Sequence, residues 1–134
     1  MKDILKVFVI DDDLDDQVLM KQAFESADTA VRVQFATRSD EALAHLVAVE
    51  KSEQPSIIVS DYNMPMMNGE EFLRRLSNEA RYDNTPKVIV STAASPSVVE
   101  ACMIQGASKY FIKPSDFEQL VQLANRIIAL AKQL

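Results

Sequence analysis

The sequence predicts an α/β domain in which helices cover both faces of a parallel sheet. Short apolar runs rich in Val and Ile recur at residues 7–10, 31–35, 57–59, 88–90 and 110–112. Four of these runs are continuously apolar, as in strands buried on both faces, whereas 31–35 alternates and is expected at an edge. Segments with helical spacing separate the runs. Because parallel neighbours need crossover connections, this alternation predicts a doubly wound sheet of five strands.

The segments between the strands carry apolar residues at i, i+3 and i+4, which is the spacing of a helix with one buried face. These stripes comprise Met20, Ala23, Phe24 and Ala27; Leu43, Leu46 and Val47; and Phe117, Leu120, Val121, Ala124, Ile127, Ile128 and Ala131.

Capping residues support the same helices. Helix starts are predicted at Ser39, at Asn68, at Ser95 before Pro96, and at a capping box from Ser115 to Glu118. Gly106 is expected to end the helix before it in the left-handed conformation.

Length and composition indicate one domain over residues 1–134, with no output domain. The chain weighs 15.0 kDa and is 48% hydrophobic, enough to fill a core without disulfides. Its single cysteine, Cys102, allows no internal disulfide and fits a reducing, cytoplasmic setting. The only histidine, His45, is expected on the solvent side of its helix.

Charge and hydropathy exclude two classes of partner. The 14 basic residues do not cluster and are outnumbered by 20 acidic ones, giving a net charge of -6, so nucleic-acid binding is not expected. No apolar run approaches the roughly 20 residues that span a bilayer, so no membrane insertion is expected.

Polar residues follow the predicted strands directly. The first strand runs into Asp11, Asp12 and Asp13, and the third into Asp61. The carboxyl ends of parallel strands share one edge of a sheet, where ligands of this class of fold bind. Carboxylates brought together there repel each other, and a hard cation holds them ionised. Mg²⁺ fits because it accepts one or two carboxylates and leaves room for phosphate oxygens.

Two further strand ends complete a site suited to phosphoryl transfer. Ser91 follows the fourth strand and Lys113 the fifth. A carboxylate can serve as the nucleophile, while Mg²⁺, the Lys113 ammonium and the Ser91 hydroxyl bind the phosphoryl oxygens. Thr92 is an alternative to Ser91 as the working hydroxyl.

At these residues the chain resembles the response-regulator receiver domains of two-component signalling, from about Ile4 to Leu130. The motifs are Val9-Ile-Asp-Asp-Asp13, Ile58-Val-Ser-Asp-Tyr-Asn-Met-Pro65 with Gly69, Val88-Ile-Val-Ser-Thr92, and Gly106-Ala-Ser-Lys-Tyr-Phe-Ile-Lys-Pro114. The resemblance implies a flavodoxin-like fold with strand order 2-1-3-4-5 and five helices.

The resemblance also implies a role for each matching residue. Asp61 would be the phosphoacceptor, and Asp11 and Asp12 would position Mg²⁺ together with Asp61 and the backbone carbonyl of Asn63. Lys113 would bind the phosphoryl group, next to a peptide bond to Pro114 that the family often holds in cis. Ser91 would be the switch hydroxyl, where threonine is commoner, and Tyr110 the rotating aromatic. Ser115 stands where the family often has an aromatic residue.

The function expected from this resemblance is a stand-alone response regulator rather than an enzyme. It would take a phosphoryl group from a histidine kinase or a histidine phosphotransfer protein and catalyse at most its own phosphorylation and dephosphorylation. One alternative is a haloacid-dehalogenase-type phosphatase with Asp11 as nucleophile and Asp13 as acid/base. A second is a receiver-like scaffold that binds partners regardless of phosphorylation.

Some residues near these motifs have simpler interpretations. Asp13, Asp15 and Asp16 are interpreted as charges that complement the dipole at the start of the first helix. Leu123, Leu130 and Leu134 widen the apolar face of the last helix. They either seal the rim of the core or form a partner or homodimer surface with the fourth helix and fifth strand, and we favour the surface.

Overall fold

The strands form one parallel sheet in the order β2-β1-β3-β4-β5, as expected. The structure is a computed structural model that describes residues 4–133. Its strands are β1 (Lys6–Ile10), β2 (Arg32–Ala36), β3 (Ile57–Asp61), β4 (Lys87–Ser91) and β5 (Lys109–Ile112). The prediction that the second run lies at an edge of the sheet is confirmed.

Five α-helices connect or follow the strands, and two short 3₁₀ helices lie between them. The α-helices are α1 (Leu14–Ala27), α2 (Ser39–Ala48), α3 (Gly69–Leu76), α4 (Pro96–Ile104) and α5 (Phe117–Ala131). The 3₁₀ helices η1 (Lys51–Glu53) and η2 (Ala80–Tyr82) precede β3 and β4 and were not predicted. Within residues 4–133, no helix combines the length and the apolar character needed to cross a membrane.

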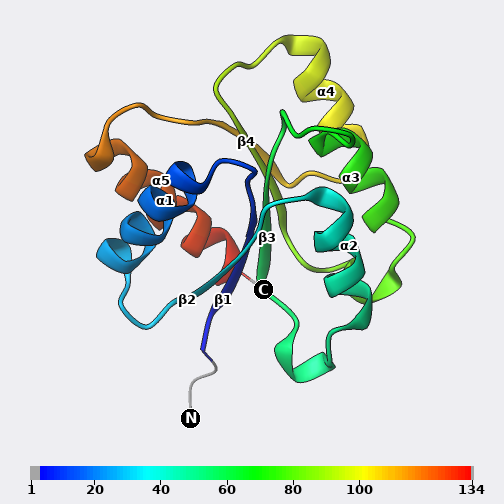
Figure 1. The fold of residues 1–134 in the computed structure, drawn as a ribbon, viewed down its shortest axis with the longest axis horizontal. Coiled ribbons are helices and arrows are strands. Elements are labelled where there is room, and N and C mark those ends of the chain that lie inside the picture. Colours follow the sequence, from blue (N-terminus) through cyan, green and yellow to red (C-terminus); the bar gives the residue numbers. More distant parts are fainter. Residues whose placement is uncertain (1–3, 134) are drawn as a thin grey trace.

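The sheet is covered on both faces, with α1 and α5 on one side and α2, α3 and α4 on the other (Figure 1). Alternation along β1 shows the two layers. Val7 and Val9 join the core under α1 and α5, whereas Phe8 and Ile10 join the core under α2 and α3. All four side chains are at most 2% exposed, which explains why this strand is continuously apolar in sequence.

The expected stripe of α2 is rotated in the structure. Ala42 and Leu46 are its buried apolar residues, while Val47 is 48% exposed. The expectation that His45 is a solvent-exposed bystander is wrong. Its ring is half-buried and stacks on the ring of Phe8, with centroids 5.3 Å apart. The apolar surface of β1 thus draws the histidine inward.

Helix α5 also departs from its expected stripe. Phe117 is 42% exposed, whereas Leu123 is only 6% exposed and belongs to the core. Leu130 packs against the same core as a half-buried side chain. The prediction of an exposed leucine surface is therefore wrong for Leu123 and holds only in part for Leu130. Both side chains face the core that lies between the sheet, α1 and α5. Leu134 lies outside the described residues.

The predicted caps are confirmed at two helices and shifted at two others. Asn68 and Ser95 cap α3 and α4 by accepting from the backbone amide three positions after the cap. Ser39 is instead the first residue of α2, and its buried hydroxyl donates to the carbonyl of Met67 at 3.0 Å. At α5 the cap is Asp116 rather than Ser115. Gly106 has φ +106°, as its left-handed position predicts.

Candidate functional site

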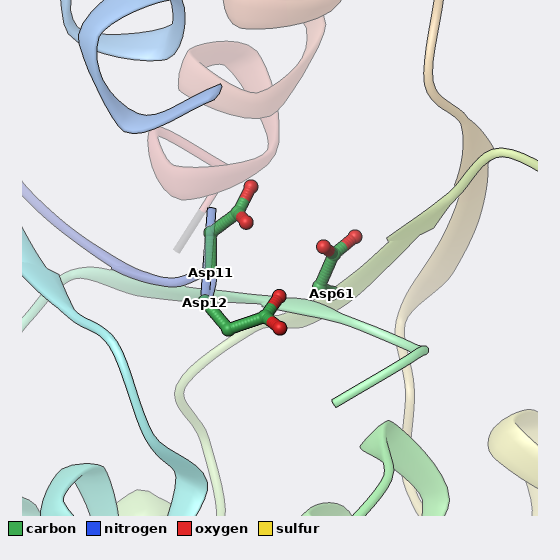
Figure 2. A group of neighbouring side chains, drawn as sticks. All are labelled: Asp11, Asp12 and Asp61. Carbon is green, nitrogen blue, oxygen red and sulfur yellow. The ribbon is translucent and has the colours of Figure 1, made fainter. Parts of the chain in front are cut away.

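Three carboxylates meet at the carboxyl edge of the sheet. Asp11 and Asp12 follow β1, and Asp61 is the last residue of the adjacent strand β3. One oxygen from each carboxylate lies within 4.8 Å of the other two (Figure 2). Asp11 is buried, Asp61 half-buried and Asp12 exposed. The arrangement presents only oxygen donors and opens to solvent at one side, which suits a hard divalent cation.

The loop after β1 is held in place by its own side chains. The Asp11 carboxylate accepts from the amide of Asp13 at 2.9 Å, and the Asp11 carbonyl accepts from the side chain of Gln17 at 2.7 Å. Asp13 caps α1 by accepting from the amides of Asp15 and Asp16. The prediction that Asp13 serves the start of the helix is confirmed, and its capping fixes the path of the chain beside Asp11.

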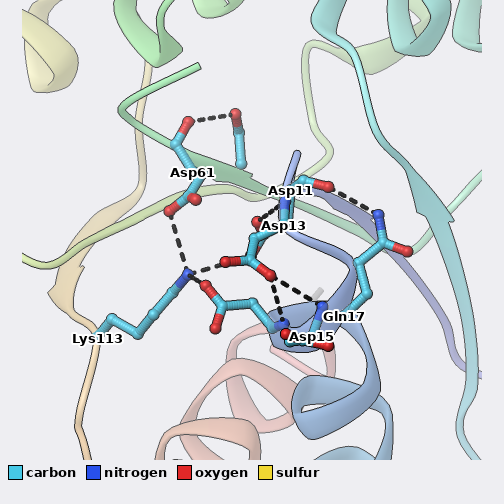
Figure 3. Close-up of polar contacts among 8 residues, drawn as sticks. Asp11, Asp13, Asp15, Gln17, Asp61 and Lys113 are labelled. Atoms are coloured by element: carbon cyan, nitrogen blue, oxygen red, sulfur yellow. Dashed lines mark hydrogen bonds and ion pairs between the residues drawn. The ribbon is translucent and has the colours of Figure 1, made fainter. Parts of the chain in front are cut away.

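Lys113 joins this edge from the end of β5. Its ammonium lies 3.1 Å from Asp11, 3.0 Å from Asp16 and 3.5 Å from Asp61 (Figure 3). Its backbone amide donates to the carbonyl of Ser91 at 2.7 Å, which fixes its main chain next to β4. The peptide bond to Pro114 is trans, so the cis form expected from the resemblance is not adopted here.

Asp16, which the sequence predicts only as a charge at the start of α1, contacts Lys113 directly. The available signal was the helix start at Asp13, which places Asp16 in the first turn just beyond the strand end. That signal alone does not specify which strand end Asp16 faces.

Burial and mutual repulsion perturb the ionisable groups of this edge. Burial, followed by the nearby charge of Asp11, raises the pKa of Asp61 to about 7. Burial likewise raises the pKa of Asp11, against the opposing effects of the Asp13 amide and Lys113. Burial disfavours the charge on Lys113, but Asp61, Asp16 and Asp11 outweigh it and raise the pKa of the ammonium. The lysine is therefore charged, whereas burial favours the neutral forms of Asp11 and Asp61.

The side chains of Ser91 and Tyr110 both hydrogen-bond to the backbone of Ala93, in the loop after β4. The Ser91 side chain is 2% exposed, and its hydroxyl accepts from the amide of Ala93 at 3.3 Å. The Tyr110 hydroxyl donates to the carbonyl of Ala93 at 2.7 Å. Of the two candidate hydroxyl residues, Ser91 is buried at the strand end beside the site, whereas Thr92 is exposed.

Gly69 allows α3 to start against the backbone that carries Asp61. Its amide donates to the carbonyl of Tyr62 at 2.9 Å. A Cβ at this position would lie 3.1 Å from the Asp61 carbonyl oxygen and 3.0 Å from Cδ1 of Ile89. Glycine is needed for this close approach. Asn63 is exposed in the same loop, and the metal role of its carbonyl stays a prediction.

Comparisons with known proteins agree with this geometry. Residues 7–125 match the model of the response regulator receiver domain. The rice protein "Two-component response regulator ORR3" is 28% identical over 122 residues, which cover 91% of this chain and 89% of that protein. A chemotaxis protein CheY homolog of Campylobacter jejuni is 24% identical, covering 75% of this chain and 78% of the homolog.

Solved structures share the fold across nearly the whole chain. The phosphorylated cyanobacterial phytochrome response regulator RcpA has a TM-score of 0.84 at 22% identity, covering 96% of this chain and 94% of that one. The Vibrio cholerae chemotaxis protein CheY4 has a TM-score of 0.78 at 27% identity, covering 92% and 98%. Motifs, strand order, acidic edge and family match all agree, and the chain belongs to the response regulator receiver domains of two-component signalling.

Proposed function

We propose that Asp61 is the phosphoacceptor of this receiver domain and that it takes a phosphoryl group from a phosphohistidine. The donor would be a histidine kinase or a histidine phosphotransfer protein. The observation that carries the proposal is the position of the Asp61 carboxylate, which lies between two further acids and a partly buried ammonium. A carboxylate beside a fixed cation is suited to accept a phosphoryl group, because the transfer depends mainly on positioning and charge stabilisation.

The transfer exchanges one bond for another. A carboxylate oxygen of Asp61 forms a bond to phosphorus as the bond between phosphorus and the donor imidazole breaks. The electron pair of the broken bond stays on the imidazole nitrogen, which then takes up a proton. Lys113 binds a phosphoryl oxygen as negative charge gathers there, and the Ser91 hydroxyl donates to another. The chain would catalyse no reaction beyond its own phosphorylation and dephosphorylation.

The acidic edge fits a bound Mg²⁺. Asp11, Asp12 and Asp61 would hold it together with the carbonyl of Asn63, since all of these are oxygen donors. When bound, the ion would neutralise charge on the phosphoryl oxygens. Burial raises the pKa of both Asp61 and Asp11, and the charge of Asp11 raises that of Asp61 further, so a bound cation would favour the ionised forms of these acids.

The signal would leave through the surface formed by α4, β5 and α5, to a partner or a second copy of the chain. Ser91 and Tyr110 share Ala93 as a hydrogen-bond partner. A Ser91 hydroxyl that turns toward a phosphoryl oxygen would give up its bond with the Ala93 amide and free the loop that also holds Tyr110. Phosphorylation shifts the population only if one loop conformation binds the phosphoryl group better.

The test is incubation with acetyl phosphate and Mg²⁺, followed by mapping of the modified residue. We expect a base-labile acyl phosphate on Asp61 that is abolished by Asp61→Asn. Asp83→Asn is the matched control, because Asp83 is an exposed aspartate that precedes β4 at the opposite edge. An adduct on Asp11 would contradict the proposal and favour a phosphatase. Modification that leaves partner binding unchanged would favour a scaffold.

The geometry gives the phosphatase alternative little support. Asp13, its expected acid/base, is occupied as the cap of α1. Asp11, its expected nucleophile, is 2% exposed and is held by the Asp13 amide and the Lys113 ammonium. Asp61 retains more access to solvent, as a residue that meets a donor protein requires.

A further inference from the structure

The proposed function leaves Asp16 without a role, although its carboxylate contacts Lys113. Asp16 lies in the first turn of α1, where its amide bonds to the carboxylate of Asp13. Its own carboxylate reaches the Lys113 ammonium at 3.0 Å, the shortest of the three carboxylate contacts of this lysine. A charge placed only to complement the helix dipole would not need this contact.

The three contacts of Lys113 are unequal. Those to Asp11 and Asp16 are hydrogen bonds of 3.1 and 3.0 Å, whereas Asp61 lies at 3.5 Å as an ion pair. An ammonium has three N–H groups. Two of them are engaged by Asp11 and Asp16, which leaves the third for the side on which Asp61 and an attached phosphoryl group would lie.

Asp11 and Asp16 differ in whether they could also bind a cation. Asp11 belongs to the group of acids that could hold a cation, and Asp16 does not. A cation that engages Asp11 competes with Lys113 for the same carboxylate. Asp16 would not be engaged by such a cation, so its carboxylate would still hold the Lys113 ammonium. The Lys113 side chain is 13% exposed, so water replaces a lost anchor poorly.

We propose that Asp16 is a positioning residue that holds the Lys113 ammonium in place while Asp11 serves the metal, so that one N–H stays directed at the phosphoryl group on Asp61. This inference rests on the proposed function of Asp61. It makes a prediction opposite to that of simple charge repulsion, because removing a negative charge near an anionic phosphoryl group would otherwise strengthen its binding.

The experiment measures the affinity of beryllofluoride, a phosphoryl mimic, in the presence of Mg²⁺ by isothermal titration calorimetry. We expect Asp16→Asn to weaken beryllofluoride binding about five- to tenfold, as expected for loss of a partly buried, charge-assisted hydrogen bond. The affinity for Mg²⁺ alone should not fall. Asp15→Asn is the matched control, because it removes the same charge one residue earlier from an exposed side chain with no contact to Lys113.

Two further measurements separate positioning from a merely structural effect. Asp16→Glu restores the charge on a longer side chain and should recover part of the affinity. The NMR signals of the Lys113 ε-methylene and ammonium groups should shift in Asp16→Asn and stay unchanged in Asp15→Asn. Thermal unfolding of the two asparagine variants checks that both are folded, because Asp16→Asn loses the contact with Lys113 in addition to one acid of the first turn of α1.

Affinity that is unchanged or tighter in Asp16→Asn would overturn the inference and leave Asp16 as a repelling charge. Equal weakening by both asparagine substitutions would overturn it too, since a general field effect would then suffice. Failure of the wild-type protein to bind beryllofluoride would instead remove the proposed function, and this inference with it.

Discussion

Two lysines are drawn into the protein at opposite ends of the sheet, and they are held in different ways. Lys87 begins β4 at the amino edge and is 9% exposed. Its ammonium donates to the carbonyls of Tyr82 at 2.5 Å and Thr85 at 3.1 Å. Lys113 follows β5 at the carboxyl edge, where three carboxylates surround it. Burial lowers the pKa of Lys87, whereas carboxylates raise that of Lys113.

The difference shows which of the two charges can change partners. Backbone carbonyls are neutral and fixed by the fold, so Lys87 ties the segment after η2 to the sheet. Carboxylates are ionised side chains that a cation or a phosphoryl group can engage in place of the lysine. A buried charge held by such groups is a candidate for function, and a buried charge held by main-chain oxygens is structural.

The largest expected effect separates the two lysines by activity. Lys113→Met should lower the rate of phosphorylation by acetyl phosphate about 100-fold, the typical loss when a positioned group that stabilises transition-state charge is removed. Lys87→Met should leave the rate unchanged, because Lys87 lies at the other edge of the sheet. The measurement is the time course of acyl phosphate formation by mass spectrometry. Equal loss in both variants would contradict a role in phosphorylation that is specific to Lys113.

The next effect concerns metal binding at the carboxyl edge. Mg²⁺ at about 100 times its dissociation constant should stabilise the fold by about 2.7 kcal/mol at pH 8. The stabilisation should shrink at pH 5.5, because the pKa of Asp61 is raised to about 7 and the carboxyl group then carries a proton. Urea unfolding with and without Mg²⁺ measures both values, with Asp12→Ala as the ligand-deficient variant. Equal stabilisation at the two pH values would contradict the metal site.

Asp61→Asn should stabilise the metal-free protein by about 2 kcal/mol at pH 8. The pKa of Asp61 is raised from 3.8 to about 7 by burial and by Asp11, so the native state binds more protons than the unfolded state between these values. The wild-type free energy of unfolding therefore falls as pH rises from about 4 to about 7, and the gain from asparagine disappears near pH 4. Urea unfolding at several pH values tests this dependence. A stabilisation that does not vary with pH would refute this explanation.

The smallest expected effect belongs to the structural lysine. Lys87→Met keeps an apolar stem of similar length but removes the donor to two carbonyls. The loss should cost about 1 kcal/mol of stability, since the carbonyl of Tyr82 still accepts from the Thr85 amide. Urea unfolding measures the change in the free energy of unfolding. A change above about 3 kcal/mol would show that Lys87 carries more of the fold than its two hydrogen bonds account for.

The sequence predicted the parts of this molecule that depend on local pattern. Five apolar runs gave the five strands, and the residues that follow them gave Asp11, Asp12, Asp61 and Lys113 at one edge. The strand order and the residue roles came from resemblance to a family. Local pattern was enough to place the four site residues at one edge, because the carboxyl ends of parallel strands lie along the same edge of a sheet.

Features that depend on packing between distant segments could not be predicted from the sequence. Lys87 is buried because the segment around η2 folds back over it, and His45 is drawn inward by Phe8 on another element. Asp16 reaches Lys113 across 97 positions of the chain. Leu123 joins the core because the face that α5 buries is wider than its narrow apolar stripe. Sequence spacing alone does not specify which distant segment each of these residues contacts.

The most direct test of the different roles of Lys113 and Lys87 follows both ammonium groups in one experiment. NMR spectra of the lysine ε-methylene and ammonium groups are recorded while Mg²⁺ and beryllofluoride are added, with Lys113→Met and Lys87→Met providing the assignments. We expect the Lys113 signals to shift as the phosphoryl mimic binds at Asp61 and those of Lys87 to stay fixed. Binding of beryllofluoride that leaves the Lys113 signals unchanged, or shifts both lysines equally, would contradict this expectation.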